Sequence, residues 1–136
     1  MKVLKFGGTS VATPHSIRKV IAFVQERSKQ GLVVVLSAFG GITDKLLETT
    51  LLASRQDLKY KKSLEEIETR HISVIKELIP IQTQSSILSK VKSDLNILET
   101  LLEGSFLIGE LTPKLSDKIV SYGELLSAFI IAEFFK

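Results

Sequence analysis

The sequence predicts an α/β fold that begins with a parallel βαβ unit and continues as long amphipathic helices. Two observations predict the βαβ unit: a short apolar run near the N-terminus, and a second one over residues 32–36, with a helical pattern between them. A third observation predicts the long helices: apolar residues recur at helical spacing from Asp44 onward. With 136 residues, 44% of them hydrophobic, the chain can form one domain with a core.

The first predicted strand contains Val3 and Leu4 and ends at two adjacent glycines. Thr13 and Pro14 follow as an N-cap and a first helical residue. Glycines let a ligand approach the backbone closely, and free N–H groups beside a helix N-terminus favour an anion such as a phosphate. A tight turn without a ligand explains the pair equally well, so both interpretations stay open. The segment consists of Lys5, Phe6, Gly7, Gly8, Thr9 and Ser10.

Lys5 precedes the glycines and could place a positive charge beside phosphate oxygens, although a lysine at a strand end is usually only solvated. The two best-known phosphate-binding motifs, G-x-x-x-x-G-K-[ST] and G-x-G-x-x-G, are absent. The sequence therefore supports neither a Walker-type ATPase nor a dinucleotide-binding fold.

The segment after Pro14 predicts an amphipathic helix that ends near Gln30, with Gly31 in the C′ position. Residues 32–36, Leu-Val-Val-Val-Leu, contain no polar residue. Such a run is typical of a strand buried on both faces, as in a parallel sheet. Strand, helix and strand then form a right-handed crossover.

A second glycine pair, Gly40 and Gly41, follows the second strand. Because parallel strands end at the same edge of a sheet, we expect it to lie beside the first pair, with the hydroxyls of Ser37 and Thr43 at that edge. Open α/β sheets bind ligands there. The alternative is an ordinary turn in which Thr43 caps a helix that begins at Asp44.

Two further amphipathic helices, around residues 64–78 and 87–102, predict an αα-hairpin. Pro80 separates them, and Gly104 is predicted to end the second. His71 lies in the apolar stripe of the first helix, where we expect a hydrogen-bonded core histidine rather than a ligand.

The last predicted helix begins after Thr112-Pro113 and is apolar over more than half of its circumference. One stripe of small residues, which includes Gly123 and Ser127, would let another element come close. Glu124 belongs to this stripe and is predicted to be a partly buried carboxylate that needs a partner. A structural salt bridge is the favoured role, and binding a substrate amine is the alternative.

Composition excludes several classes of protein. The 18 basic and 15 acidic residues give a net charge of +3 and are dispersed, so nothing favours a nucleic-acid partner. Without cysteine, and with only two histidines, the chain has neither a disulfide framework nor a thiolate or histidine-rich metal site. No signal-peptide pattern or membrane-length apolar run occurs, so we expect a cytoplasmic protein without a membrane partner.

Only two strands are predicted, and a two-stranded parallel unit cannot cover itself well. The last helix is strongly apolar up to Phe134 and Phe135. We therefore expect the chain to be the first part of a longer protein.

Three segments together resemble the aspartate kinases, which have the amino-acid kinase fold. They are residues 3–12 with K-F-G-G-T-S, residues 35–43 ending in G-I-T, and residues 120–127 with S-Y-G-E-L-L-S. Their order and the helical insertion at about 60–104 fit the family as well. The resemblance implies that residues 1–136 are the N-terminal portion of one amino-acid kinase domain. The remainder of the kinase domain and the regulatory domains would then be absent.

The resemblance implies transfer of the γ-phosphate of ATP to the side-chain carboxylate of L-aspartate, giving 4-phospho-L-aspartate for lysine, threonine and methionine biosynthesis. Lys5, Gly7 and Gly8 would hold the ATP phosphates, with Lys5 as the catalytic residue and Mg²⁺ accompanying the ATP. Their segment 5–10, with Phe6, Thr9 and Ser10, would bind the nucleotide.

By the same resemblance, Thr43 and Glu124 would bind aspartate, Glu124 through the α-ammonium group, and Ser37 would line the same pocket. Tyr122 departs from the residues common in relatives, which puts only local contacts in question.

Two alternatives remain. The chain could belong to another amino-acid kinase, for example one acting on glutamate or a nucleoside monophosphate. It could also be a helical self-association module, inactive as isolated, and we expect a homo-oligomer in either case. The sequence does not decide whether the parent protein is fused to a homoserine dehydrogenase.

Overall fold

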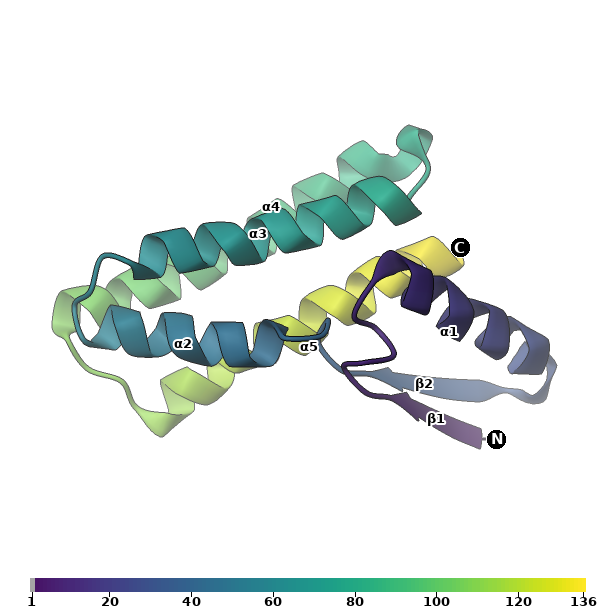
Figure 1. The fold of residues 1–136 in the computed structure, drawn as a ribbon, viewed down its shortest axis with the longest axis horizontal. Helices are drawn as coiled ribbons and strands as arrows, with labels where there is room; N and C mark the ends of the chain where they lie inside the picture. The colour runs from purple at the N-terminus through teal and green to yellow at the C-terminus, as the bar shows by residue number, and fades with distance from the viewer. Residues whose placement is uncertain (1) are drawn as a thin grey trace.

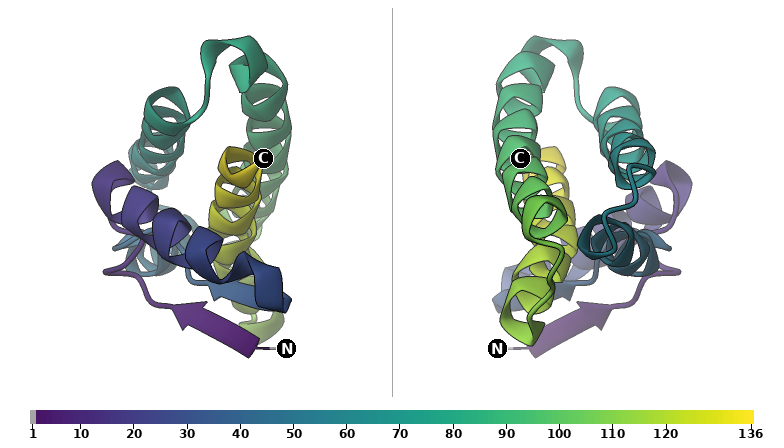
Figure 2. Two further views of the ribbon diagram at one scale, coloured as in Figure 1. Left: turned by 90° about the vertical axis from the view of Figure 1, so that its right-hand side faces the viewer. Right: turned by 90° about the vertical axis from the view of Figure 1, so that its left-hand side faces the viewer.

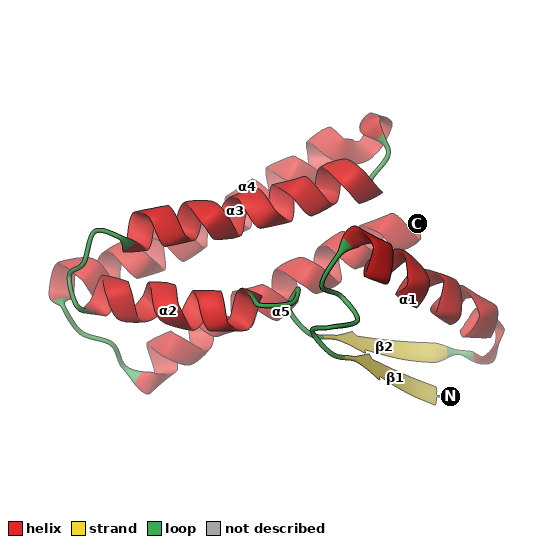
Figure 3. Cartoon of the chain, viewed as in Figure 1, coloured by secondary structure: helices red, strands yellow, loops and turns green. Residues whose placement is uncertain are grey.

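Two parallel strands lie at one end of the computed structural model, and helices extend from them (Figure 1; Figure 3). The structure describes residues 2–136, and for Gln30 the backbone only. The predicted βαβ unit, helical hairpin and C-terminal apolar helix are all confirmed. In order, the elements are β1 (Lys2–Phe6), α1 (Pro14–Arg27), the 3₁₀ turn η1 (Ser28–Gln30), β2 (Leu32–Leu36), α2 (Ile42–Ser54), α3 (Tyr60–Leu78), α4 (Ile81–Ile108) and α5 (Pro113–Phe135).

The strands pair in parallel without offset, from Lys2 opposite Leu32 to Phe6 opposite Leu36. One further bond extends the ladder, because the N–H of Ser37 donates to the carbonyl oxygen of Phe6 at 3.1 Å. Both strands therefore end at the same level, and the segments that follow them begin side by side.

Helix α1 begins as predicted. Thr13 is extended, and its hydroxyl oxygen accepts the N–H of Ser16 at 3.1 Å. The helix ends at Arg27, earlier than predicted, because the backbone of residues 28–30 tightens into a 3₁₀ turn before Gly31, which has a φ of +71°.

Only one face of the sheet is covered. On that face the ring of Phe6 packs edge-on against Phe23 of α1, with 6.1 Å between ring centroids. On the other face Val3, Val33 and Val35 are 65%, 44% and 42% exposed. The prediction of a second strand buried on both faces is therefore wrong for residues 2–136, because α1 and α5 pack on the same side of β2.

Helices α2, α3, α4 and α5 pack against one another, and their buried apolar side chains form one continuous core with Ile17 and Ile21 of α1. In both views of Figure 2 the loop that joins α3 to α4 lies at the top and β1 lies at the bottom. Within residues 2–136 no helix combines the length and apolar character needed to cross a membrane. The most deeply buried side chains of this core include Ile67, Ile75, Leu98, Leu102, Ile119, Leu126 and Ile130.

The predicted end of the hairpin at Gly104 is wrong, because α4 continues to Ile108. Gly109, with a φ of +75°, is the left-handed residue that ends it. The extra turn is held by packing: Phe106 lies against Tyr60 of α3, with 5.2 Å between ring centroids. The buried hydroxyl of Ser105 also donates to the carbonyl oxygen of Glu110 at 2.7 Å.

Helix α5 is capped by Thr112, whose hydroxyl oxygen accepts the N–H of Leu115 at 3.1 Å. Its Gly123 permits close packing, since a Cβ there would lie 2.9 Å from the Cβ of Ala38 and 3.1 Å from Leu46. The stripe of small residues predicted to admit another element therefore faces the end of β2 and the start of α2.

Gly104 and Gly123 are both helical, which gives a matched test of this packing. Gly104→Ala should raise the free energy of unfolding by about 0.5–1 kcal/mol, because a Cβ there meets nothing within 4 Å and alanine favours the helix. Gly123→Ala should lower it by about 1–3 kcal/mol through overpacking. Urea titrations followed by circular dichroism measure both, and equal shifts in the same direction would contradict this packing.

Candidate functional site

The two glycine turns touch each other at the carboxyl ends of β1 and β2. A Cβ on Gly40 would lie 2.8 Å from the Cβ of Ala12 and 3.0 Å from the carbonyl oxygen of Gly8. The N–H of Gly40 donates to the carbonyl oxygen of Val11 at 3.4 Å. Only glycine fits at position 40, and the predicted juxtaposition of the two turns is confirmed.

The first turn leaves backbone donors free. Two hydrogen bonds close this turn. The N–H of Ser10 donates to the carbonyl oxygen of Gly7 at 3.1 Å, and the N–H of Val11 donates to that of Gly8 at 3.3 Å. The N–H groups of Gly8 and Thr9 find no acceptor among residues 2–136. Gly8 lies beside the second turn, since a Cβ on it would be 3.7 Å from the Cα of Gly40. Free backbone donors at such a turn can bind an anion.

The strand places the side chains of Lys5 and Phe6 on opposite faces. Lys5 is exposed, whereas the ring of Phe6 is directed toward α1 and packs on Phe23. Of the predicted nucleotide-binding segment, Phe6 can therefore offer only its backbone. Thr9 is exposed and Ser10 is half-buried.

Free backbone donors lie at the N-terminus of α2 as well as at that of α1. In α1 the cap on Thr13 uses the N–H of Ser16, and Pro14 has no N–H. In α2 the N-cap is Gly41, which has a φ of +84° and no side chain to cap the helix. The N–H groups of Gly41, Thr43 and Asp44 find no acceptor among residues 2–136.

Thr43 is not a helix cap. Helix α2 begins at Ile42, one residue earlier, so Thr43 lies within the first turn. Its side chain is exposed, and among residues 2–136 its hydroxyl makes no hydrogen bond. The alternative that assigned this hydroxyl to capping is wrong, and the group is free to meet a ligand.

Helix α5 holds the end of β2. The hydroxyl of Ser127 donates to the carbonyl oxygen of Ser37 at 2.7 Å, and the hydroxyl of Ser37 donates to the carbonyl oxygen of Ala38 at 2.8 Å. One turn earlier, Gly123 lies against Ala38. The hydroxyl of Ser37 also lies 3.7 Å from the position of a Cβ on Gly8, at the junction of the turns.

Glu124 lies at the edge of this contact. It is exposed, and among residues 2–136 its carboxylate forms no ion pair. The predicted partial burial and the structural salt bridge are both wrong, because Gly123 and Ser127 make the contact while the neighbouring Glu124 stays outside it. Its negative charge is available beside the end of β2.

Arg70 of α3 joins the two turns and was missed by the sequence analysis. Its Nη1 donates to the carbonyl oxygen of Gly40 at 2.9 Å, and its Nη2 donates to that of Ala12 at 2.6 Å. The only signal in the sequence was its place three residues after the buried Ile67, at the edge of the apolar stripe.

His71 packs against Phe39, a residue of the second turn. It is fully buried, its Nδ1 bonds the carbonyl oxygen of Ile67 at 2.7 Å, and its ring lies 5.2 Å from that of Phe39. The predicted core location is confirmed, but Nε2 has no partner. Burial lowers the pKa of His71 to about 4, and the nearby charge of Arg70 acts in the same direction.

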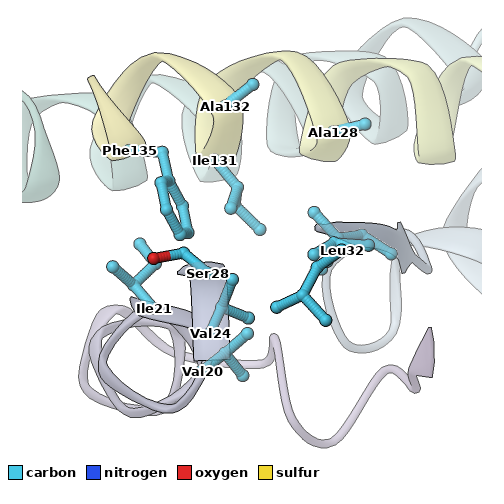
Figure 4. Close-up of a pocket in the computed structure, with 11 residues that line it drawn as sticks. Val20, Ile21, Val24, Ser28, Leu32, Ala128, Ile131, Ala132 and Phe135 are labelled. Carbon is cyan, nitrogen blue, oxygen red and sulfur yellow. The ribbon is translucent and has the colours of Figure 1, made fainter. Parts of the chain in front are cut away.

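Two cavities differ in chemistry. An apolar cleft of about 490 Å³ lies between α1, β2 and α5, with Ser28 as its one polar side chain (Figure 4). This cleft has no group suited to an anion. A cavity of about 230 Å³ adjoins the second turn and is lined by Gly41, Lys45, Glu66 and Arg70. Lys45 and Glu66 form an ion pair there, which lowers the pKa of the Glu66 carboxyl.

Within residues 2–136 no group of three or more histidine, aspartate or glutamate side chains converges on a metal position. At the ends of the strands the described residues supply neutral backbone donors, hydroxyls, the exposed ammonium group of Lys5 and the exposed carboxylates of Asp44 and Glu124. This set suits an anion beside a small zwitterionic molecule.

Residues 1–136 match the amino acid kinase family. The chain is 31% identical over 130 residues to the chloroplastic bifunctional aspartokinase/homoserine dehydrogenase 2 of Zea mays, covering 96% of this chain and 14% of that protein. It is 34% identical over 135 residues to the chloroplastic aspartokinase 1 of Arabidopsis thaliana, covering 97% of this chain and 23% of that protein.

A solved relative is E. coli aspartokinase III. Its complex with lysine and aspartate superposes with a TM-score of 0.83 at 29% identity, over 98% of this chain and 28% of that one. Its complex with aspartate and ADP gives 0.79 at 28% identity. These matches confirm the predicted amino-acid kinase-like α/β fold, and the chain spans less than a third of each of these relatives.

His71 predicts a pH dependence of stability. Its pKa is about 4 in the folded chain and 6.5 unfolded, so between these values the unfolded chain binds the extra proton. Lowering the pH from about 7 to about 5 should therefore reduce the free energy of unfolding by about 2 kcal/mol through this group alone. Urea titrations at the two pH values measure it.

His71→Leu should abolish most of that loss, whereas replacement of the exposed His15 by Asn should preserve it. An unchanged pH dependence in the His71 variant would show that the buried imidazole is not responsible.

Proposed function

The chain belongs to the amino acid kinase family, and we propose that it forms the N-terminal portion of an aspartate kinase domain. Both named plant relatives and the E. coli structure are aspartokinases, and each is several times longer than this chain. In this proposal residues 1–136 belong to one kinase domain, with the α3–α4 hairpin as its helical insertion.

The whole protein would transfer the γ-phosphoryl group of ATP to the side-chain carboxylate of L-aspartate, giving 4-phospho-L-aspartate. The observation that carries this proposal is the meeting of two glycine turns and the uncapped N-terminus of α2 at one edge of the sheet. Phosphoryl transfer depends mainly on positioning and on charge stabilisation. Free backbone donors in a fixed arrangement supply both.

The nucleotide side of the site would be the first turn. The free N–H groups of Gly8 and Thr9 would bind phosphate oxygens, with Gly7 allowing the close approach. Lys5 would place its ammonium group against the transferred phosphate as the catalytic residue, while Phe6 and Ser10 shape the turn. Mg²⁺ would accompany the ATP and neutralise phosphate charge. Among residues 2–136 no cluster of three or more histidine, aspartate or glutamate side chains would hold it.

The aspartate side would be formed by Ser37, Thr43 and Glu124. Glu124 has an exposed carboxylate without a partner among residues 2–136, which suits the α-ammonium group of an amino acid. Thr43 has a free hydroxyl in the first turn of α2, and Ser37 lies at the junction of the turns. Aspartate and ADP are named in the E. coli aspartokinase III complex, which supports this choice of substrate.

Of the two plant relatives, one is a bifunctional aspartokinase/homoserine dehydrogenase and the other is named only as an aspartokinase. For this chain we propose a cytoplasmic location, whereas both plant relatives are chloroplastic. The exposed valines of the sheet, Val3, Val33 and Val35, favour self-association and therefore a homo-oligomer. Self-association is also what the alternative function, a helical self-association module, would need.

One kinetic experiment on the full-length protein tests the assignment. Glu124→Gln should raise the KM for aspartate by roughly 10- to 100-fold, the value of a charge-assisted bond, with little change in the KM for ATP. Lys5→Met should instead lower kcat by roughly 100-fold or more. Coupled measurement of ADP release gives all three constants, and Glu99→Gln, at an exposed position of α4, is the matched control.

Two results would contradict the proposal. Turnover with another acid but not with aspartate would refute the substrate. An unchanged KM in Glu124→Gln would favour a family member whose substrate has no α-ammonium group.

A further inference from the structure

We propose that Arg70 is a positioning residue that fixes the backbone of both glycine turns for phosphoryl transfer. The inference rests on the proposed function for its catalytic part, because it assigns to the helical insertion a role at the site that the turns form. Its structural part, the joining of the two turns by one side chain, is independent of the substrate.

A single guanidinium group spans the two turns. Its Nη1 bonds the carbonyl oxygen of Gly40 at 2.9 Å and its Nη2 bonds that of Ala12 at 2.6 Å, across 30 and 58 positions of sequence. The guanidinium is planar and its donors have a fixed spacing, so the two bonds set the separation of the two carbonyl groups. A lysine, with a single point charge on a flexible stem, could not impose that spacing.

The two bonds also orient backbone donors. The described chain has no cis peptide bond, and in a planar trans peptide the N–H points opposite to the carbonyl of the preceding residue. With the carbonyls of Ala12 and Gly40 held toward Arg70, the N–H groups of Thr13 and Gly41 point away from it. Neither N–H finds an acceptor among residues 2–136, so both remain available to a ligand on the far side.

The charge of Arg70 is not used in an ion pair. Among residues 2–136 no carboxylate bridges to it, and Glu66, which lines the same cavity, pairs with Lys45. A charged donor on a carbonyl strengthens that bond and polarises the peptide group, which makes its N–H a better donor. Arg70 therefore both places the free N–H groups and increases their attraction for an anion.

The test compares Arg70→Met and Arg70→Lys with Arg18→Met in the full-length protein, at temperatures well below unfolding. Arg18 is the matched control because it also donates to a backbone carbonyl, that of Glu77 at 3.1 Å, away from the turns. Two readouts are needed: kcat and KM for both substrates, and hydrogen–deuterium exchange of residues 7–13 and 38–43 without ligand.

Arg70→Met should lower kcat/KM for ATP by roughly 10- to 100-fold, the effect of losing two charge-assisted hydrogen bonds. Exchange in both turns should become faster, while exchange in α4 stays unchanged. Arg70→Lys should give intermediate values, and Arg18→Met should behave as the wild type.

Wild-type kinetics in Arg70→Met would overturn the proposal, because faster exchange with intact kinetics marks a purely structural residue. Wild-type exchange of the turns in this variant would overturn it as well, because the turns would then not depend on Arg70. If that variant does not fold, wild-type constants and exchange in Arg70→Lys would overturn it. A wild-type protein inactive on aspartate, with turn exchange altered only by the Arg70 variants, would refute the proposed substrate and support the joining of the turns.

Discussion

The structure depends on a close backbone approach between two glycine turns. Gly40 lies so near Ala12 and Gly8 that any side chain would collide, with a Cβ only 2.8 Å from that of Ala12. The parallel register of β1 and β2 brings the turns to one level, and the absence of a side chain lets them touch. Everything else that characterises the candidate site is arranged around this contact.

Helices distant in sequence support the contact from different sides. From α3, Arg70 joins the turns through their carbonyl oxygens and His71 packs beneath Phe39. From α5, Ser127 bonds the end of β2 and Gly123 packs on Ala38. A chain with two short strands and long helices can thus hold a site at the strand ends, because the helices act as a scaffold for two short loops.

Local rules predicted much of this from the sequence. The caps at Thr13 and Thr112, the break at Pro80 and the apolar stripes depend on neighbouring residues, and the structure confirms them. Features set by distant contacts were missed. The fold decides that α4 passes Gly104, that one sheet face is open and that Glu124 is exposed. Arg70 bonds backbone carbonyl oxygens, and its place at the edge of the apolar stripe does not reveal those partners.

The central claim is that the two turns together form one crevice for phosphates and a small acid. A crystal structure of the full-length protein with a non-hydrolysable ATP analogue and aspartate tests it most directly. The account predicts phosphate oxygens within hydrogen-bonding distance of the N–H groups of Gly8 and Thr9, and the aspartate ammonium group beside Glu124. Phosphates bound away from both turns, for example at the cleft between α1 and α5, would contradict it.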